Sequence, residues 1–213
     1  MLFSEERQGF RVLRDSFDKI RSDFEKAVAR LHAQFDTRIM ENRFVVGGVL
    51  EIILGAAFRA CGVQVLHRGA TATSWDLIFE NEKGGYSVKS VFRSTTTRLI
   101  NVQGRQPSVK DWNIATLFLI PEGIVYADPE LPWWQENISQ VIKVHPDALQ
   151  ISLSSIRRFV RECPEWFIEY NLFVHQIHRE ERIPGRTLSS QLAAQILMEI
   201  GGVLFQNFPP LLG

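Results

Sequence analysis

The chain has 213 residues, of which 45% are hydrophobic, and its acidic and basic side chains balance at 24 each. This length is enough for one domain with a full core, and the composition excludes an intrinsically disordered protein. The balanced charge argues against a polycation that coats nucleic acid indiscriminately, but it allows a local basic face.

No feature of the sequence predicts export or a membrane segment. The first ten residues, MLFSEERQGF, carry acids where a secretory signal needs a positive start and an apolar run. No apolar stretch reaches the roughly 18 to 20 uncharged residues of a membrane helix. Cys61 and Cys163 lie far apart and show no metal-type spacing. We therefore expect a cytoplasmic protein in a reducing environment, with no membrane partner.

Residues 1–40 are predicted to form one long N-terminal helix. Apolar side chains recur at steps of three and four, with charges on the other face. The residues of this apolar face are Phe10, Leu13, Phe17, Ile20, Phe24, Val28, Leu31 and Phe35. Such a helix packs on the core or on a second subunit.

Residues 42–60 are predicted to form a second helix, capped by Asn42 and ended by the Cys-Gly pair that follows it. This helix is apolar on nearly all sides, and Glu51 is the one ionisable residue between its terminal arginines. An unpaired carboxylate in such a helix is costly, so Glu51 should reach a cleft edge, pair with a cation or hold a metal. Small residues beside it should let another segment approach closely: Gly47, Gly48 and Gly55.

The middle of the chain is predicted to form strands. The strand-like segments are 63–69, 74–80, 86–92, 114–120 and 123–127. Residues 81–85, NEKGG, are typical of a hairpin turn between the second and third segments. Period-two alternation then allows Asp76 and Lys89 to project from the same face of the hairpin. The alternative is a solvent-facing salt bridge.

Helices are predicted again after the strands, over 152–163, continuing through 164–178, and over 187–205. The order of helices, strands and helices predicts a single α/β (α+β) domain over residues 1–213. Its central mixed sheet is expected to be flanked by helices, with additional N- and C-terminal helices.

The order of Glu51, Asp76 and Lys89 resembles the PD-(D/E)XK nuclease superfamily, and type II restriction endonucleases in particular. In that family a Glu on the first core helix precedes an Asp at a strand end and a (D/E)-x-Lys motif on the next strand. The resemblance covers residues 42–127 and implies a restriction-endonuclease-like catalytic core. Ser87 stands where the family has its second acid, so Glu51, or less plausibly Asp111, would have to replace it.

The resemblance implies an endonuclease that uses Mg²⁺ to hydrolyse phosphodiester bonds in double-stranded DNA. Asp76 and Glu51 would supply carboxylate ligands, and the carbonyl of Val88 a third protein ligand. Lys89 would orient the attacking water and counter the phosphate charge. Ser87 would hydrogen-bond a metal-bound water.

The segment that follows the hairpin is basic. From Ser87 to Lys110 it holds five cations and no acid, interleaved with hydroxyl and amide side chains. Such side chains suit phosphates and base edges, although many ordinary polar loops have a similar composition. The candidates for DNA binding are Arg93, Arg98, Asn101, Gln103, Arg105 and Lys110.

Cutting both strands of a palindrome calls for a homodimer. The first and last helices, within 1–40 and 128–213, are the candidate interface. Two alternatives stay open: a DNA-binding module on a decayed nuclease scaffold, and a structure-specific repair or transposition nuclease. The pair His175 and His178 lacks two further ligands, so a zinc site is not favoured.

Overall fold

The chain folds as an α/β protein in a computed structural model that describes residues 2–35, 39–69, 75–92, 94–102, 104–172 and 188–210. The helices of this part are α1 Ser4–Ser16, α2 Arg21–Gln34, α3 Met40–Ala60, α4 Pro132–Val141, α5 Leu153–Glu162, α6 Ser189–Ile200 and α7 Gly202–Gln206. Short 3₁₀ turns cover Phe17–Lys19, Val109–Asp111 and Pro164–Trp166.

The strands form two sheets. Their bounds are β1 Val65–His67, β2 Leu77–Phe79, β3 Gly85–Ser90, β4 Thr96–Asn101, β5 Thr116–Ile120, β6 Gly123–Ala127, β7 Ile142–Val144, β8 Ala148–Ser152 and β9 Phe167–Glu169. The main sheet has the order β1-β2-β3-β5-β6-β9, and the second sheet has the order β4-β8-β7. Only β3 and β5 pair in parallel within the main sheet, so the predicted mixed sheet is confirmed.

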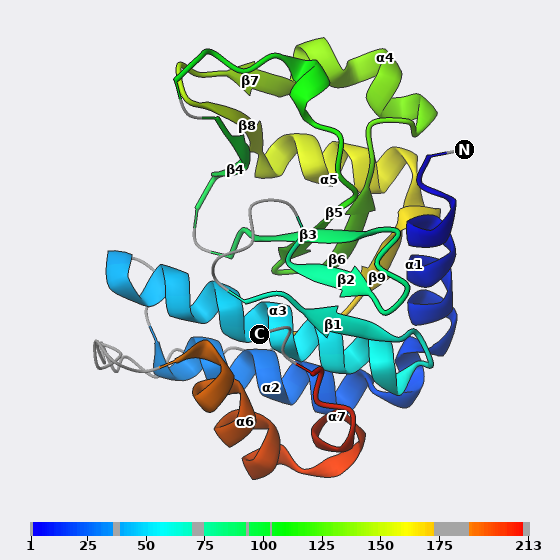
Figure 1. Cartoon of the computed structure of the whole chain (residues 1–213), viewed down its shortest axis with the longest axis vertical. Helices are drawn as coiled ribbons and strands as arrows, with labels where there is room; N and C mark the ends of the chain where they lie inside the picture. Colours follow the sequence, from blue (N-terminus) through cyan, green and yellow to red (C-terminus); the bar gives the residue numbers. More distant parts are fainter. Residues whose placement is uncertain are drawn as a thin grey trace.

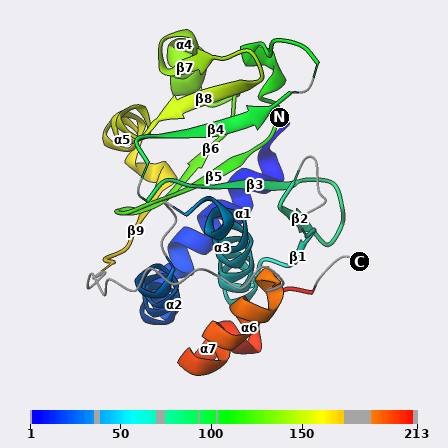
Figure 2. The same cartoon turned by 90° about the vertical axis from the view of Figure 1, so that its left-hand side faces the viewer.

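A parallel pair requires a long crossover, and here the crossover builds part of the second sheet. Residues 91–115 leave the main sheet after β3, form β4 and return to β5. Figures 1 and 2 show the second sheet with α4 and α5 on one side of the main sheet and α3 on the other. The predicted polar loop after the hairpin is therefore partly a strand.

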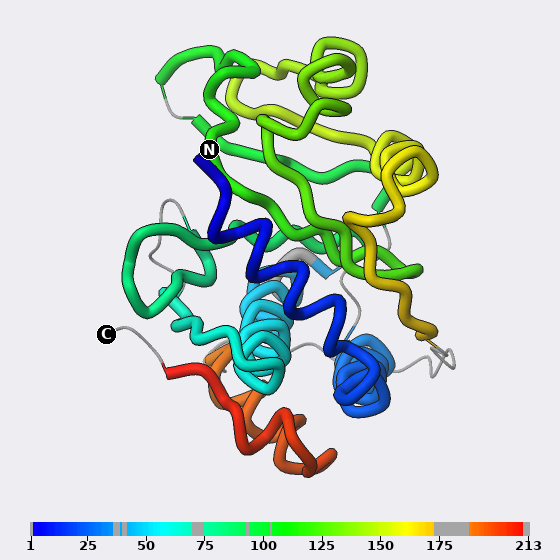
Figure 3. The backbone as a smooth tube through the Cα atoms, turned by 90° about the vertical axis from the view of Figure 1, so that its right-hand side faces the viewer, coloured from blue at the N-terminus to red at the C-terminus, as the bar shows by residue number. Residues whose placement is uncertain are grey.

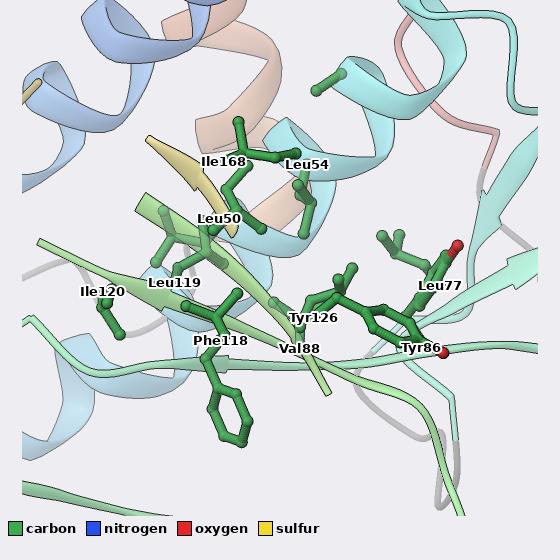
Figure 4. Packing of buried hydrophobic residues seen from close by; sticks show 14 of the residues in the cluster. Leu50, Leu54, Leu77, Tyr86, Val88, Phe118, Leu119, Ile120, Tyr126 and Ile168 are labelled. Carbon is green, nitrogen blue, oxygen red and sulfur yellow. The ribbon is translucent and has the colours of Figure 1, made fainter. Parts of the chain in front are cut away.

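Helix α3 forms the centre of the helical layer. It contacts β1 and β3 on one side and α2, α6 and α7 on the other. In Figure 4, Leu50 and Leu54 of α3 lie against Leu119 and Ile168 of the sheet, while the ring of Phe118 points to the opposite side. The sheet is thus covered on both faces, which explains strands such as β5 and β6 that are buried along their whole length.

The single long N-terminal helix was a wrong prediction. Its apolar residues are all buried, as expected, but α1 and α2 are separate helices joined by the 3₁₀ turn. Ile20, with φ near −120°, lies outside the helical range, and the turn brings Phe17 edge-on to Phe24. Figure 3 shows α1 crossing one side of the molecule at a steep angle to α2. The spacing of the apolar residues showed which face is buried but did not predict the bend.

Helix α3 begins at Met40, so the prediction of Asn42 as its cap was wrong, and Asn42 is buried inside the first turn. The predicted end is confirmed at Cys61, followed by Gly62 with φ +91°. A Cβ on Gly48 would lie 2.5 Å from Oγ of Ser189 in α6. One on Gly55 would lie 3.1 Å from Pro209, whereas Gly47 has open space. Two of the three glycines thus allow the predicted close approach.

The prediction of helix over 164–178 was wrong for its first part. A 3₁₀ turn leads into β9, which pairs with the far edge of the main sheet. The hydroxyl of Tyr170 then donates to the carbonyl of Ile120 at 2.6 Å, which fixes this segment to the sheet. The remainder, with His175 and His178, lies outside the described residues.

The predicted final helix is two helices, because Gly201 and Gly202 both have positive φ, at +70° and +74°. No helix among the described residues is both long enough and apolar enough to span a bilayer.

Candidate functional site

The hairpin of β2 and β3 brings Asp76 to Ser87, Val88 and Lys89. Asp76 directly precedes β2, and its amide donates to the carbonyl of Tyr86 at 2.9 Å. The register partner of Tyr86 within β2 is Leu77. Two successive residues of one strand therefore face one residue of the next, which is the arrangement of a β-bulge. A bulge changes the direction of a side chain, and this one lies at the predicted acid.

The carboxylate of Asp76 accepts two hydrogen bonds from β3. Its Oδ2 accepts from the amide of Val88 at 2.6 Å and from the hydroxyl of Ser87 at 3.1 Å. Nζ of Lys89 lies 3.8 Å from the same oxygen. The side chains of Asp76 and Lys89 are 20% and 28% exposed, so the pair is accessible from one side and is not a fully solvated salt bridge.

The ladder between β3 and β5 determines where the carbonyl of Val88 points. The amides of Ser87 and Val91 donate to the carbonyls of Ala115 and Leu119, so alternate residues of β3 face β5. Val88 lies between them, and its amide and carbonyl face the other way, toward Asp76. The structure thus brings together four of the predicted site residues.

Glu51 has a different immediate partner. Its Oε2 lies 2.8 Å from Nε2 of His67 in β1. The Glu51 side chain is 19% exposed and that of His67 only 5%. His67 pairs in register with Leu77, the residue after Asp76, and the amide of Arg68 donates to the carbonyl of Asp76. The structure gives Glu51 an imidazole partner, and the predicted pairing with a cation stays untested.

The available donor groups restrict which metal the site would suit. Among the residues described, no three His, Cys, Asp or Glu side chains come together in a way that could hold a metal ion. The described contacts of the Asp76 carboxylate all use Oδ2. Mg²⁺ binds through one or two carboxylates and keeps several waters, whereas structural zinc needs four protein ligands. The arrangement is compatible with hydrated Mg²⁺ beside Asp76 and does not fit tetrahedral zinc.

The predicted DNA-binding residues are distributed over β4 and the crossover. Arg98 and Asn101 lie on β4, exposed, and one Arg98 nitrogen donates to both Asn101 and Asp147, at 3.1 and 3.2 Å. Lys110 is exposed in the second 3₁₀ turn. Arg93 and Gln103 lie outside the described residues.

Arg105 makes a two-pronged ion pair with Asp111, at 2.6 and 2.7 Å. The Arg105 guanidinium and the backbone of Ser108 hold the pKa of Asp111 well below its usual range. Asp111 also caps the 3₁₀ turn with Ser108. These contacts assign Asp111 a local structural role and give no support to it as the missing acid. The guanidinium of Arg105 is thus already engaged by Asp111.

His67 is the residue at this site that sequence reasoning missed. It stands in the strand-like segment VQVLHRG, where one polar side chain among apolar neighbours is a weak signal. Its contact with Glu51 depends on the packing of α3 against β1, which has no local signature. Comparison of the chain with protein families, curated proteins and solved structures finds no match.

Proposed function

We propose that this protein is a Mg²⁺-dependent endonuclease that cleaves double-stranded DNA, with a restriction-endonuclease-like core. The observation that supports it most is the convergence of Asp76, Ser87, Val88 and Lys89 at one partly exposed end of the hairpin. An acid and an amine from neighbouring strands, 3.8 Å apart, are the groups that the family resemblance requires there.

The chemistry assigns each group a role. Mg²⁺, when bound, lowers the pKa of a coordinated water and stabilises negative charge that develops on the phosphate. Asp76 would hold the ion, with the carbonyl of Val88 on the same side and Glu51 as the second carboxylate. Lys89 would hold the attacking water by hydrogen bonding and offset the charge of the scissile phosphate. Ser87 would keep Asp76 oriented through the hydrogen bond that it already donates.

DNA would reach this site along the crossover. Arg98 and Asn101 are on β4, which follows β3 by a short connection, and both are exposed. Arginine and asparagine suit guanine and adenine edges in the major groove. A sequence-specific type II restriction enzyme acting as a homodimer is the member of this class that we favour.

A DNA-binding module on a decayed nuclease scaffold is the second candidate. Two observations favour it: Ser87 occupies the place of an acid, and Glu51 is bound to His67. A structure-specific repair or transposition nuclease would share the chemistry and differ in its DNA preference.

Cleavage of plasmid DNA tests the proposal. Wild-type protein with Mg²⁺ should yield discrete fragments, and EDTA should abolish them. Lys89→Ala should lower the rate about 100- to 1000-fold, the range for loss of one group that stabilises charge in the transition state. Lys83→Ala is the matched control, because Lys83 is an exposed lysine in the turn of the same hairpin. It should cut like wild type.

The possible outcomes separate the candidates. Gel retardation without cutting under any divalent cation supports the decayed scaffold. Nicking confined to junctions, flaps or lesions supports the repair class. Full-rate cutting by Asp76→Ala would show that the site lies elsewhere.

A further inference from the structure

Arg68 follows β1 directly and lies opposite Asp76. Its amide donates to the carbonyl of Asp76 at 3.1 Å, which continues the pairing of β1 with β2 by one residue past His67 and Leu77. Gly69 then has φ +76°, a conformation that favours glycine, so the extended course of the strand ends after Arg68. Arg68 therefore lies at the same end of the sheet as Asp76.

The side chains of Arg68 and Lys89 project from the same face of the main sheet. His67, Leu77 and Tyr86 pair in register across β1, β2 and β3, and all three are buried. Residues that pair in register share a face, and successive residues of a strand alternate between faces. Arg68 comes one residue after His67 and so projects from the opposite face. Lys89, which comes three residues after Tyr86, does the same.

The two cations differ in how they are engaged. Nζ of Lys89 lies 3.8 Å from Oδ2 of Asp76, so these two charges largely offset each other. Arg68 is exposed, and its side chain makes no hydrogen bond or ion pair within the part of the chain that the structure describes. With Arg68 beside them, the three side chains together carry a net positive charge.

An exposed arginine in this place suits a phosphate. Its guanidinium is always charged, and its planar fork of donors fits two oxygens of one phosphate group. Most contacts between proteins and DNA are of this kind, and they fix the position of the duplex without reading its sequence. An arginine at the strand next to Asp76 is therefore placed to hold the DNA backbone beside the proposed site.

From this arrangement we infer that Arg68 is a phosphate-binding residue, which holds the DNA backbone on the β1 side of Asp76 while Lys89 faces the scissile phosphate. The inference rests on the proposed function, from which it takes DNA as the ligand. The contact itself needs no metal ion, because it joins a guanidinium to a phosphate.

DNA binding without cleavage tests the inference directly. Fluorescence anisotropy of a short labelled duplex in EDTA gives the binding constant over a series of KCl concentrations. The logarithm of this constant falls with the logarithm of the salt concentration, by about 0.9 for each phosphate that the protein neutralises. Arg68→Gln should therefore lower the steepness of the dependence by about one. It should weaken binding by the same factor for duplexes of different sequence.

Two further variants separate the charge of Arg68 from its packing. Arg68→Lys keeps the charge and should keep the wild-type salt dependence, while part of the affinity is lost with the guanidinium fork. Lys26→Gln is the matched control, because Lys26 is an exposed cation of α2, which packs against α3 on the side away from the sheet. It should bind DNA like wild type at every salt concentration.

Three results would overturn the inference: no DNA binding by wild type, an unchanged salt dependence in Arg68→Gln, or an equal loss in Lys26→Gln. A loss confined to particular sequences would also count against it, because it would indicate a contact with bases. Plasmid cleavage with Mg²⁺ is scored separately. If wild type cuts and Arg68→Gln keeps the salt dependence, the nuclease stands and the phosphate contact fails. If wild type binds DNA through Arg68 but never cuts, the reverse holds.

Discussion

At the scale of single residues, Ser87 shows how one side chain alters the site. Its hydroxyl is buried and donates to Asp76, at the position where the nucleases that the sequence resembles have a second acid. An acid in this place would face Oδ2 of Asp76 and repel it, and a divalent cation would relieve that repulsion. A serine avoids this repulsion when no metal is present, and it would weaken the hold of the proposed site on a cation.

Ser87→Asp should therefore lower the melting temperature without metal, by a few degrees. Mg²⁺ should raise it again, because a ligand that binds the folded state stabilises it. Thermal unfolding with Mg²⁺ and with EDTA measures both effects. Ser87→Asn, of similar size and without charge, is the control. An equal response of the two variants to Mg²⁺ would show that residue 87 does not face a cation.

The residues of the hairpin were predictable because their relation is local. The turn brings β2 and β3 side by side and so places Asp76 near Lys89, but the spacing alone does not fix the register or the bulge at Asp76. The partner of Glu51 was not predictable. It depends on how α3 packs against β1, and the sequence between them does not determine that packing.

At the scale of elements, α1 contacts the hairpin of β2 and β3 next to its turn, where β3 begins. Oε1 of Glu6 accepts from the amide of Gly85 at 3.3 Å, and the hydroxyl of Tyr86 donates to the carbonyl of Glu6 at 2.7 Å. Arg7 pairs with the buried Asp128 after β6, at 2.8 Å. These contacts join α1 to the hairpin and to the end of β6, so α1 supports the strands that carry the site.

Glu6 makes this support dependent on pH. Burial raises the pKa of the Glu6 carboxyl, with smaller opposing effects from hydrogen bonds. A raised pKa in the folded state means that its contribution to stability is complete below about pH 4, the unfolded value, and is lost as pH rises through the folded value. Glu6→Gln stays neutral, so it should gain stability over wild type at pH 7 relative to pH 4.

Urea unfolding at the two pH values measures the difference. Glu136→Gln is the control, because Glu136 is an exposed acid on another helix, α4. Its effect should be similar at both pH values. A Glu6→Gln difference that does not change with pH would contradict the assigned effect of burial.

Elements with a strong periodic pattern were predicted, and those defined by distant partners were not. The apolar faces of α1, α2 and α3 and the strands β5 and β6 are readable from spacing alone. β4 reads as a polar loop because its outer side chains are exposed and its ladder partner, β8, comes some fifty residues later. β9 is three residues long and becomes a strand only because β6 offers it an edge.

At the scale of the whole molecule, apolar side chains remain exposed on the two C-terminal helices. Met198 of α6 and Val203 and Phe205 of α7 are 62%, 40% and 43% exposed. We call them the C-terminal apolar face. Figure 1 shows α6 and α7 at the end of the molecule opposite α4 and β7. This face is where the proposed homodimer would form, within the C-terminal region suggested by the sequence.

Phe205→Asp should convert the proposed dimer to a monomer, because a charge at a buried interface is costly. Light scattering after size-exclusion chromatography measures the mass. Val144→Asp is the control, since Val144 on β7 is equally exposed, at 43%, at the opposite end. It should stay dimeric. A monomeric wild type at micromolar concentration would refute the dimer.

The crossover has one further consequence. β3 ends at Ser90, directly after Lys89, and the same chain enters the second sheet at Thr96. The amide of Leu153, at the start of α5, bonds to the carbonyl of Thr95, which anchors the connection at its far end. The lysine beside Asp76 is thus only a few residues along the chain from the first residue of the second sheet.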